Sequence, residues 1–459
     1  MPASVATALY AIFIIWLFKL ERDQESLVSP ALWIPVLWFS IGASRMVSMW
    51  FGGIGQSAMP TVSAQLEEGS VVDRLIFTGL LLAGLAVLAR RGRQTNEVLG
   101  ANWIILLFFL YAAASILWSD YSFVSFKRWS KAVGNVVMVF LILTEPDSNA
   151  AIKSLLARAS FLLIPTSVLL IKYYPDYGRV YNQFTGQAEY IGVHTGKNGL
   201  AMICLILGFG ALWRVIEALK IPDRSYKKRH LIAHGAILGM ALWLLYMAHS
   251  AAALGCAFIG SGLVWLTGLR RRAVKPLTLH MAVVAIMCIC VYGIIVDTNV
   301  GLVQAVGRDA TLTDRTSLWH DLARVDINPW FGTGFESFWL GERLELMGAK
   351  YWWQPNQAHN GYLELYLNLG WAGIFLQAIL IVWGYRNISN SLREGEELAG
   401  LKLTLFVVAL IFNLTEATFK VVSPMWIVFL LAVSIVPRRD NQDDQLSVGV
   451  PEPKKVVSF

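Results

Sequence analysis

The chain consists of long apolar stretches separated by polar segments, and this pattern continues almost from one end to the other. Thirteen stretches fit a membrane helix, near residues 3–18, 31–50, 74–89, 101–118, 132–145, 155–172, 199–219, 231–248, 251–269, 278–297, 361–385, 401–415 and 419–436. A helix of about 20 apolar residues crosses the roughly 30 Å hydrocarbon core of a bilayer. Because the fifth stretch and the last two are short, we predict an all-α transmembrane bundle of about 12–13 spans.

Two polar segments are long enough to carry structure of their own. Residues 173–198 form a short loop, and residues 298–360 form the longest one. Within the longer loop, apolar residues at helical spacing predict an amphipathic helix lying on the membrane: Leu318, Trp319, Leu322 and Val325. We expect four regions: ten membrane helices and the short loop in 1–297, the large loop in 298–360, C-terminal membrane helices in 361–436, and a disordered tail in 437–459.

The composition supports the membrane interpretation and orients the chain. Of the 459 residues, 56% are hydrophobic and 15% are charged, whereas soluble proteins carry about 25% charged residues. The net charge of +7 does not indicate a nucleic-acid partner, because the basic residues flank the apolar stretches. The basic segments alternate correctly if all are cytoplasmic: 90–93, 220–230, 270–275 and 437–439. We therefore predict an N-terminus outside and a C-terminus inside.

On this topology, several ionisable residues fall on the outer side of the membrane. They come from separate segments and include Lys127, Arg128, Lys131, Arg179, His194, Lys197, Arg308, Arg315, Arg324, Glu416 and Lys420. If the cations converge, they would suit a membrane-embedded anion, because guanidinium grips phosphate in a bidentate manner and lysine adds a point charge. For any single residue, a solvated loop charge or a side chain reaching the lipid headgroups is the alternative.

His359 and Asn360 stand directly before the apolar stretch that begins at Gly361. An imidazole at the outer interface can accept a proton near neutral pH, so His359 is a candidate general base. A capping or structural role is the alternative, and Asn360 is an equally good helix cap. The phosphate-binding cations expected nearby favour the catalytic interpretation of His359.

Three motifs in this order carry a family resemblance: "GVHTGKNGLA" (192–201), "TLTDRTSLWHDLARVDINPWFGTGFESFW" (311–339) and "HNGYLELYLNLGWAGI" (359–374). Together they resemble the O-antigen ligase and O-antigen polymerase family of bacterial surface-polysaccharide enzymes. The segment "SILWSDYSFVSFKRW" and the "HTGKN" form of the first motif are most similar to the exopolysaccharide branch, the succinoglycan-type polymerases.

The resemblance implies a multi-pass protein of the bacterial inner membrane with a periplasmic active site. It implies an undecaprenyl-pyrophosphate-linked glycan as donor and a glycan hydroxyl as acceptor, with the bilayer and other polysaccharide assembly proteins as partners. His359 matches the family's loop-end histidine, and Arg315 matches the arginine before the amphipathic helix. Lys197 and Arg179 fall where the family has basic residues in its shorter loop. The secondary candidates are His194, Asn198, Arg308, Asn360, Glu416 and Arg128.

The expected reaction is a metal-independent glycosyl transfer. Arg315, Lys197 and Arg179 would stabilise the departing pyrophosphate, and His359 would accept the proton of the incoming hydroxyl. We expect no cofactor and no metal, because the sequence has no P-loop pattern and its outer segments have no Asp-x-Asp motif. The first motif reads Gly-Lys-Asn where ligases commonly have Asn-Pro-Asn, which favours a polymerase over a ligase acting on lipopolysaccharide core.

Two alternatives from other classes stay open. A lipid-linked glycan transporter or flippase would place ionisable residues near the bilayer midplane, whereas here the polar residues gather at one face. A non-catalytic scaffold of a polysaccharide assembly complex would tolerate the loss of His359.

Overall fold

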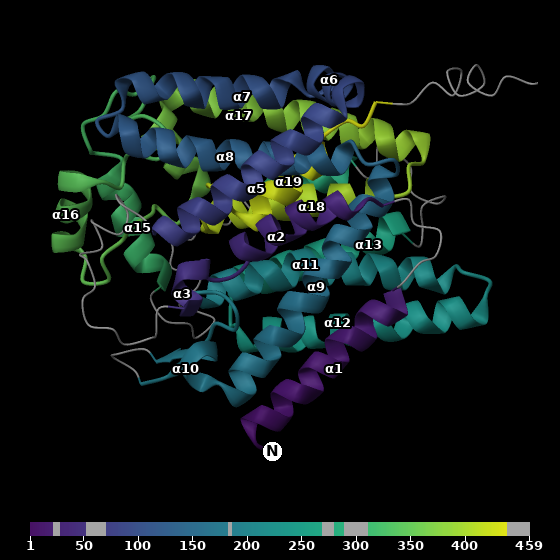
Figure 1. Cartoon of the computed structure of the whole chain (residues 1–459). Coiled ribbons are helices and arrows are strands. Elements are labelled where there is room, and N and C mark those ends of the chain that lie inside the picture. The colour runs from purple at the N-terminus through teal and green to yellow at the C-terminus, as the bar shows by residue number, and fades with distance from the viewer. Residues whose placement is uncertain (22–27, 52–69, 182–185, 269–279, 289–310, 438–459) are drawn as a thin grey trace, which may run out of the picture.

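The computed structural model describes residues 1–21, 28–51, 70–181, 186–268, 280–288 and 311–437. Within these ranges the chain folds into helices and one antiparallel pair of short strands, β1 (Arg179–Tyr181) and β2 (Ala188–Tyr190) (Figure 1). The helices of the first half are α1 (Ala3–Glu21), η1 (Pro30–Leu32), α2 (Trp33–Gly42), α3 (Val47–Phe51), α5 (Val71–Arg90), α6 (Gly92–Ala101), α7 (Trp103–Ala114), η2 (Ser115–Trp118), α8 (Ser122–Leu143), α9 (Ser148–Tyr173) and α10 (Pro175–Gly178). Those of the second half are α11 (Lys197–Leu219), α12 (Arg224–Met247), α13 (Ala251–Gly268), α15 (Thr311–Leu322), α16 (Gly341–Lys350), α17 (Gly361–Glu394), α18 (Ala399–Thr415) and α19 (Pro424–Val433).

The predicted all-α polytopic bundle is confirmed. Among the described residues, seven helices are long and apolar enough to cross a membrane: α1, α5, α9, α11, α12, α13 and α17. The pair formed by α6 and residues 103–118 would be an eighth, although it bends by 81°. Residues 30–42, α18 and α19 are shorter apolar helices. The stretch expected as one span at 31–50 is divided, because α2 ends at Gly42 and α3 begins at Val47.

The centre of the bundle is built from helices that are apolar on every side. Side chains of α11, α18 and α19 are buried along most of their lengths, and these helices pack against α9, α12, α13 and α17. Helices α1 and α5 are also apolar, yet they leave large side chains such as Leu9, Ile12 and Leu75 exposed. Because a helix without a polar face must be buried in protein or in hydrocarbon, we infer that these outer helices face lipid.

The described part of the large loop, residues 311–360, has a small hydrophobic core of its own. Leu318 and Leu322 of α15 pack there with Phe338, Trp339 and other side chains, and Leu318 is 0% exposed. Helices α15 and α16 lie together at one end of the bundle (Figure 1). The predicted amphipathic helix exists, but its apolar face packs inside the loop instead of lying on the membrane. Side chains of α16 and α17, such as Leu344 and Leu367, pack against the face that the sequence pattern assigned to the membrane.

The loop is fastened to a break in α17. Gly370 has a φ of 62°, so the helical hydrogen bonds are interrupted there. The carbonyl oxygens of Leu367 and Asn368 instead accept hydrogen bonds from the backbone N–H groups of Thr333 (3.1 Å) and Gly334 (2.9 Å). A Cβ on Gly370 would lie 2.3 Å from the backbone of Trp330. Only glycine therefore permits this approach, which fixes the "NPWFGTG" turn against the membrane helix.

Candidate active site

Glu416 is the residue at which four separate segments meet. It directly follows α18, and its side chain is 12% exposed. Its Oε1 accepts hydrogen bonds from Arg315 Nη2 of α15 (2.9 Å) and from Asn198 Nδ2 at the start of α11 (2.5 Å). His359, the residue two before α17, places its Nδ1 3.3 Å from Oε2. One carboxylate thus joins both long polar segments of the sequence to the end of α18.

The backbone around His359 explains why this motif reads His-Asn-Gly. His359 itself has a φ of 50°, in the left-handed region. Asn360 is the N-cap of α17, and its Oδ1 accepts hydrogen bonds from the N–H groups of Tyr362 (3.0 Å) and Leu363 (3.2 Å). Gly361 lies against α18, since an added Cβ would come within 2.0 Å of Asn413 Oδ1. The structure therefore gives Asn360 the capping role, and the glycine lets the histidine approach Glu416.

Asn413 shapes the turn on which Glu416 stands. Its Oδ1 accepts hydrogen bonds from the backbone N–H groups of Thr418 (3.0 Å) and Phe419 (3.1 Å), and from the Thr418 hydroxyl (3.1 Å). Because Asn413 is buried and fully engaged on this side, the turn is held in a defined position. The Glu416 carboxylate is therefore presented towards α11 and α15 instead of turning into solvent.

Arg315 binds α15 to the end of α18. Its Nη2 contacts Glu416, and its Nη1 donates to the backbone oxygen of Thr415 at 2.7 Å. The guanidinium group thus satisfies one of the last carbonyl groups of α18, which have no partner inside the helix. The Arg315 side chain is still 19% exposed, so it is not fully enclosed by the protein.

The charges around Glu416 keep it ionised. Burial by itself would raise the pKa of Glu416, but the hydrogen bond from His359 and the positive charge of Arg315 outweigh that effect and hold the pKa below its ordinary value. A neutral His359 that donates from Nδ1 to this carboxylate carries its lone pair on Nε2. The His359 side chain is 20% exposed, and none of the described residues hydrogen-bonds Nε2. The arrangement can thus accept a proton at Nε2 and stabilise the resulting imidazolium.

The other predicted cations make different contacts. Lys197 Nζ pairs with Glu189 Oε1 of β2 at 2.8 Å. Arg179 of β1 donates from Nε (3.0 Å) and Nη2 (2.7 Å) to the backbone oxygen of Ile171, near the end of α9. Arg128 of α8 donates to the backbone oxygen of Glu336. Among the described residues, no direct contact joins any of these three cations to Glu416 or His359, and Arg308 lies outside the described residues.

His194 packs beneath the start of α11. A Cβ on Gly199 would lie 2.0 Å from its Nδ1, so the imidazole fills the space that this glycine leaves. The same Nδ1 accepts a hydrogen bond from the Gly196 N–H at 3.3 Å. Burial, together with the positive charge of Arg45, lowers the pKa of His194 to about 4. His194 is therefore a neutral structural group near pH 7.

Glu364 is a site-forming residue that the sequence analysis did not single out. Its Oε2 accepts hydrogen bonds from the backbone N–H of Ala358 (2.7 Å) and from Trp339 Nε1 (3.0 Å). Its Oε1 lies 3.3 Å from Lys420 Nζ. By holding Ala358, this carboxylate fixes the segment that carries His359. The sequence does contain a signal for Glu364, because it is an acidic residue in the first turn of an apolar helix, where a charge without partners is costly.

Comparisons with known proteins point to one family. Residues 235–378 match the family model described as O-antigen ligase. Over 341 residues, the chain is 24% identical to the exopolysaccharide production protein ExoQ of Rhizobium meliloti. This alignment covers 69% of this chain and 74% of that protein. The resemblance to the O-antigen ligase family is confirmed. The segment that matches the O-antigen ligase model contains Arg315 and His359, whereas Asn198 and Glu416 reach the site from outside it.

Proposed function

We propose that this protein is a membrane glycosyltransferase that polymerises undecaprenyl-pyrophosphate-linked oligosaccharide repeat units at the periplasmic face of the bacterial inner membrane. The observation that carries the proposal is the contact between His359 and Glu416, with Arg315 bound to the same carboxylate. The match to the O-antigen ligase model and the similarity to an exopolysaccharide production protein support the same class of reaction.

His359 acts as the general base in this proposal. An acceptor hydroxyl approaches Nε2 and gives its proton to that nitrogen, while its oxygen forms a bond to the anomeric carbon of the donor sugar. The bond from the anomeric carbon to the pyrophosphate oxygen breaks, and the leaving group departs as lipid pyrophosphate. Glu416 orients the ring through Nδ1 and stabilises the imidazolium that forms. Such an arrangement contributes about 10²–10⁴-fold to a reaction rate, and a single displacement inverts the anomeric centre.

Arg315 is the first candidate for the pyrophosphate clamp. It already stands beside the proposed base, its side chain is partly exposed, and a guanidinium group suits bidentate contact with phosphate oxygens. Lys197 is the second, and a pyrophosphate group would compete with Glu189 for its ammonium. Arg179 is the third, and its contact with Ile171 leaves its positive charge uncompensated by that neutral carbonyl. These fixed cations would take the role that a metal ion has in many other transferases.

The division of the chain follows the same proposal. Residues 1–297 and 361–436 would provide the membrane helices, residues 298–360 would form a periplasmic loop that carries the base, and residues 437–459 would be a cytoplasmic tail. In the described part, the start of α11, the start of α17 and the end of α18 meet at one end of the bundle through Asn198, His359 and Glu416. This shared end is the one that we assign to the periplasm.

An O-antigen ligase is the second candidate function, and the description of the matching family model favours it. The donor chemistry would be identical, and only the acceptor would change from another repeat unit to a lipopolysaccharide core. The deciding experiment is reconstitution of the purified protein with a lipid-pyrophosphate-linked repeat unit, with and without core lipid. A ladder of repeat multiples without core lipid supports the polymerase. A product that forms only on core lipid identifies a ligase, and the absence of any transfer to either acceptor contradicts both.

A further inference from the structure

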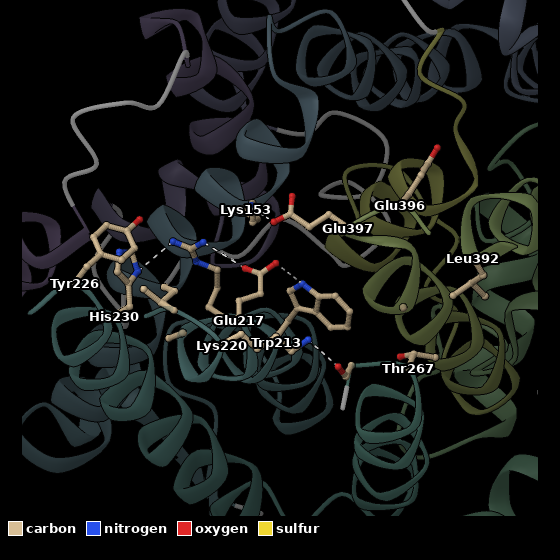
Figure 2. A pocket seen from close by; sticks show the side chains of 15 residues that line it. Lys153, Trp213, Glu217, Lys220, Tyr226, His230, Thr267, Leu392, Glu396 and Glu397 are labelled. Atoms are coloured by element: carbon tan, nitrogen blue, oxygen red, sulfur yellow. Dashed lines mark hydrogen bonds and ion pairs between the residues drawn. The ribbon is translucent and has the colours of Figure 1, made fainter. Parts of the chain in front are cut away.

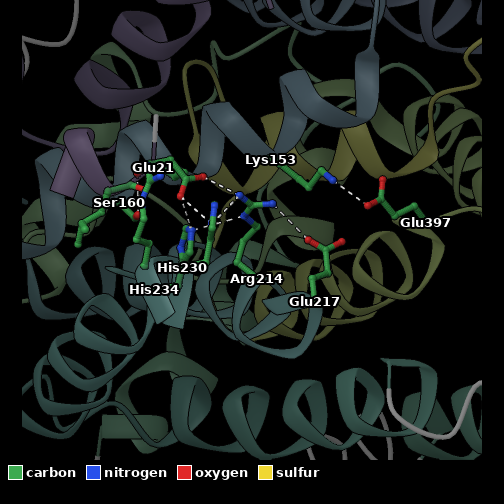
Figure 3. A network of polar contacts seen from close by, with 11 residues as sticks. Glu21, Lys153, Ser160, Arg214, Glu217, His230, His234 and Glu397 are labelled. Carbon is green, nitrogen blue, oxygen red and sulfur yellow. Dashed lines mark hydrogen bonds and ion pairs between the residues drawn. The ribbon is translucent and has the colours of Figure 1, made fainter. Parts of the chain in front are cut away.

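A second polar cluster lies at the other end of α11. Arg214 of this helix is 16 residues beyond Asn198, which corresponds to about 24 Å along a helix. Around Arg214 stand Glu21, the last residue of α1, and His230 and His234 of α12 (Figure 3). The two histidines are four residues apart and therefore project from the same face of α12. They are 2% and 1% exposed.

The distances within this cluster suit one shared cation. Glu21 Oε2 lies 2.8 Å from His234 Nε2 and 3.3 Å from His230 Nδ1, and the three ligand atoms all fall within 4.8 Å of one another. A tetrahedral zinc ion with bonds of about 2.0–2.1 Å holds its ligand atoms about 3.3 Å apart. Two histidines and one glutamate, with a fourth position open, form one of the established zinc ligand sets.

The guanidinium group of Arg214 now occupies the position of that cation. Its Nη2 is 2.8 Å from Glu21 Oε1 and 3.2 Å from His230 Nδ1, and its Nε is 3.4 Å from His234 Nε2. All three candidate ligands thus face a positive charge. Glu217 offers Arg214 a second acidic partner, with Nη1 3.4 Å from Oε2. The Arg214 side chain can therefore move away from the histidines and still have its positive charge balanced by Glu217.

The outer nitrogens of the two rings leave the tautomer of each histidine free to change. His230 Nε2 and His234 Nδ1 are buried without a hydrogen-bond partner among the described residues. Since no such bond fixes the tautomer, each ring can carry its proton on the outer nitrogen and offer the inner lone pair to an ion. A cavity of about 390 Å³ adjoins the cluster, and Arg214, Glu217 and His230 are among the residues that line it (Figure 2). It has room for the displaced guanidinium and for a water on the open position.

We propose that Glu21, His230 and His234 bind one divalent transition-metal ion such as Zn²⁺, in exchange for the Arg214 guanidinium. The bound ion links α1 and α12 at the end of the bundle opposite to His359. This site is separate from the proposed transfer reaction and does not depend on it. In the absence of the ion, the same residues form a neutralised Arg–Glu–His network that holds α1, α11 and α12 together.

The test uses the full-length protein in nanodiscs, purified with an affinity tag that contains no histidine and stripped with a chelator. Equilibrium dialysis with Zn²⁺ should give one bound ion per chain, and Co²⁺ should show the visible absorption of a four-coordinate complex. The double variant His230→Ala/His234→Ala and the variant Glu21→Gln should each lose this ion. The variants His249→Ala and His320→Ala, which change histidines elsewhere, should keep it.

Arg214→Gln separates the exchange from a merely structural network. If the guanidinium competes with the ion, its removal should tighten Zn²⁺ binding at least threefold. Zn²⁺ should also raise the melting temperature of the wild-type protein but not that of Glu21→Gln. Failure of the wild-type protein to bind one equivalent overturns the proposal, and so does an ion that survives the double histidine substitution. Weaker binding in Arg214→Gln overturns the exchange.

Discussion

The Nδ1 atom of His359 lies 3.3 Å from Oε2 of Glu416, although 57 residues separate the two in sequence. This contact joins the end of the large loop to the end of α18. It gives the imidazole a fixed direction and an anionic partner, which are the two properties that a general base at a membrane interface needs.

The first prediction concerns the base and its partner. We expect His359→Asn to lower turnover by about 10²–10⁴-fold, and we choose asparagine because it tolerates the positive φ of this position. Glu416→Gln removes a charged hydrogen bond worth about 1.5–3 kcal/mol, which corresponds to about 10–100-fold in rate. The measurement is steady-state glycosyl transfer by the reconstituted protein. His320→Ala on α15 serves as the control. Full turnover of Glu416→Gln would contradict the proposed role of Glu416 in supporting His359.

The second prediction concerns donor binding. Arg315→Ala should weaken binding of a lipid-pyrophosphate by about 10–100-fold, because it removes charge-assisted hydrogen bonds. Arg315→Lys should restore only part of the affinity, since lysine cannot make the bidentate contact. Native mass spectrometry or isothermal titration with the lipid measures this. Arg93→Ala is the matched control because Arg93 is an exposed residue of α6 paired with Glu97. Equal losses in both alanine variants would remove Arg315 from the clamp.

The third prediction concerns the packing that places His359. A Cβ at position 361 would displace Asn413 and the turn that carries Glu416. Gly361→Ala should therefore destabilise the protein by about 1–3 kcal/mol, as overpacked sites do. Gly235→Ala in α12 meets no atom within 4 Å, and it should be neutral or stabilising by up to about 1 kcal/mol. Thermal unfolding in the same detergent compares the two. A Gly361→Ala protein as stable as Gly235→Ala would disprove the close approach of α17 to α18.

The fourth prediction concerns pH. The pKa of His194 is lowered from 6.5 to about 4 in the folded protein, so between these values the unfolded chain binds more protons than the folded one. The stability contributed by neutral His194 is present above pH 6.5 and is lost as the pH falls towards 4, by up to about 3 kcal/mol. We expect His194→Gln to flatten this part of a stability profile. A variant with an acid dependence identical to that of the wild-type protein would argue against a half-buried, neutral His194.

Local pattern located long helices such as α9 and α11 because apolar runs determine where a chain can cross a membrane, although it joined α2 and α3 into one span. The segment 314–325 shows the limit of such reasoning. Its periodicity predicted an amphipathic helix, and α15 is that helix. Periodicity cannot say which apolar partner covers the face, and Phe338 and Trp339 of the same loop pack there instead of lipid. The break in α17 was also invisible, since a glycine within an apolar run does not by itself reveal a kink.

The candidate site shows the same division. The sequence by itself determined which residue types stand at each end of the membrane helices, because charges are costly inside hydrocarbon and collect at its borders. Only the tertiary structure decided that Asn198, Arg315 and His359 share the carboxylate of Glu416, while Lys197 and Arg179 pair elsewhere. The physical reason is that hydropathy sets the depth of a residue in the membrane, whereas side-chain packing between helices distant in sequence sets its neighbours.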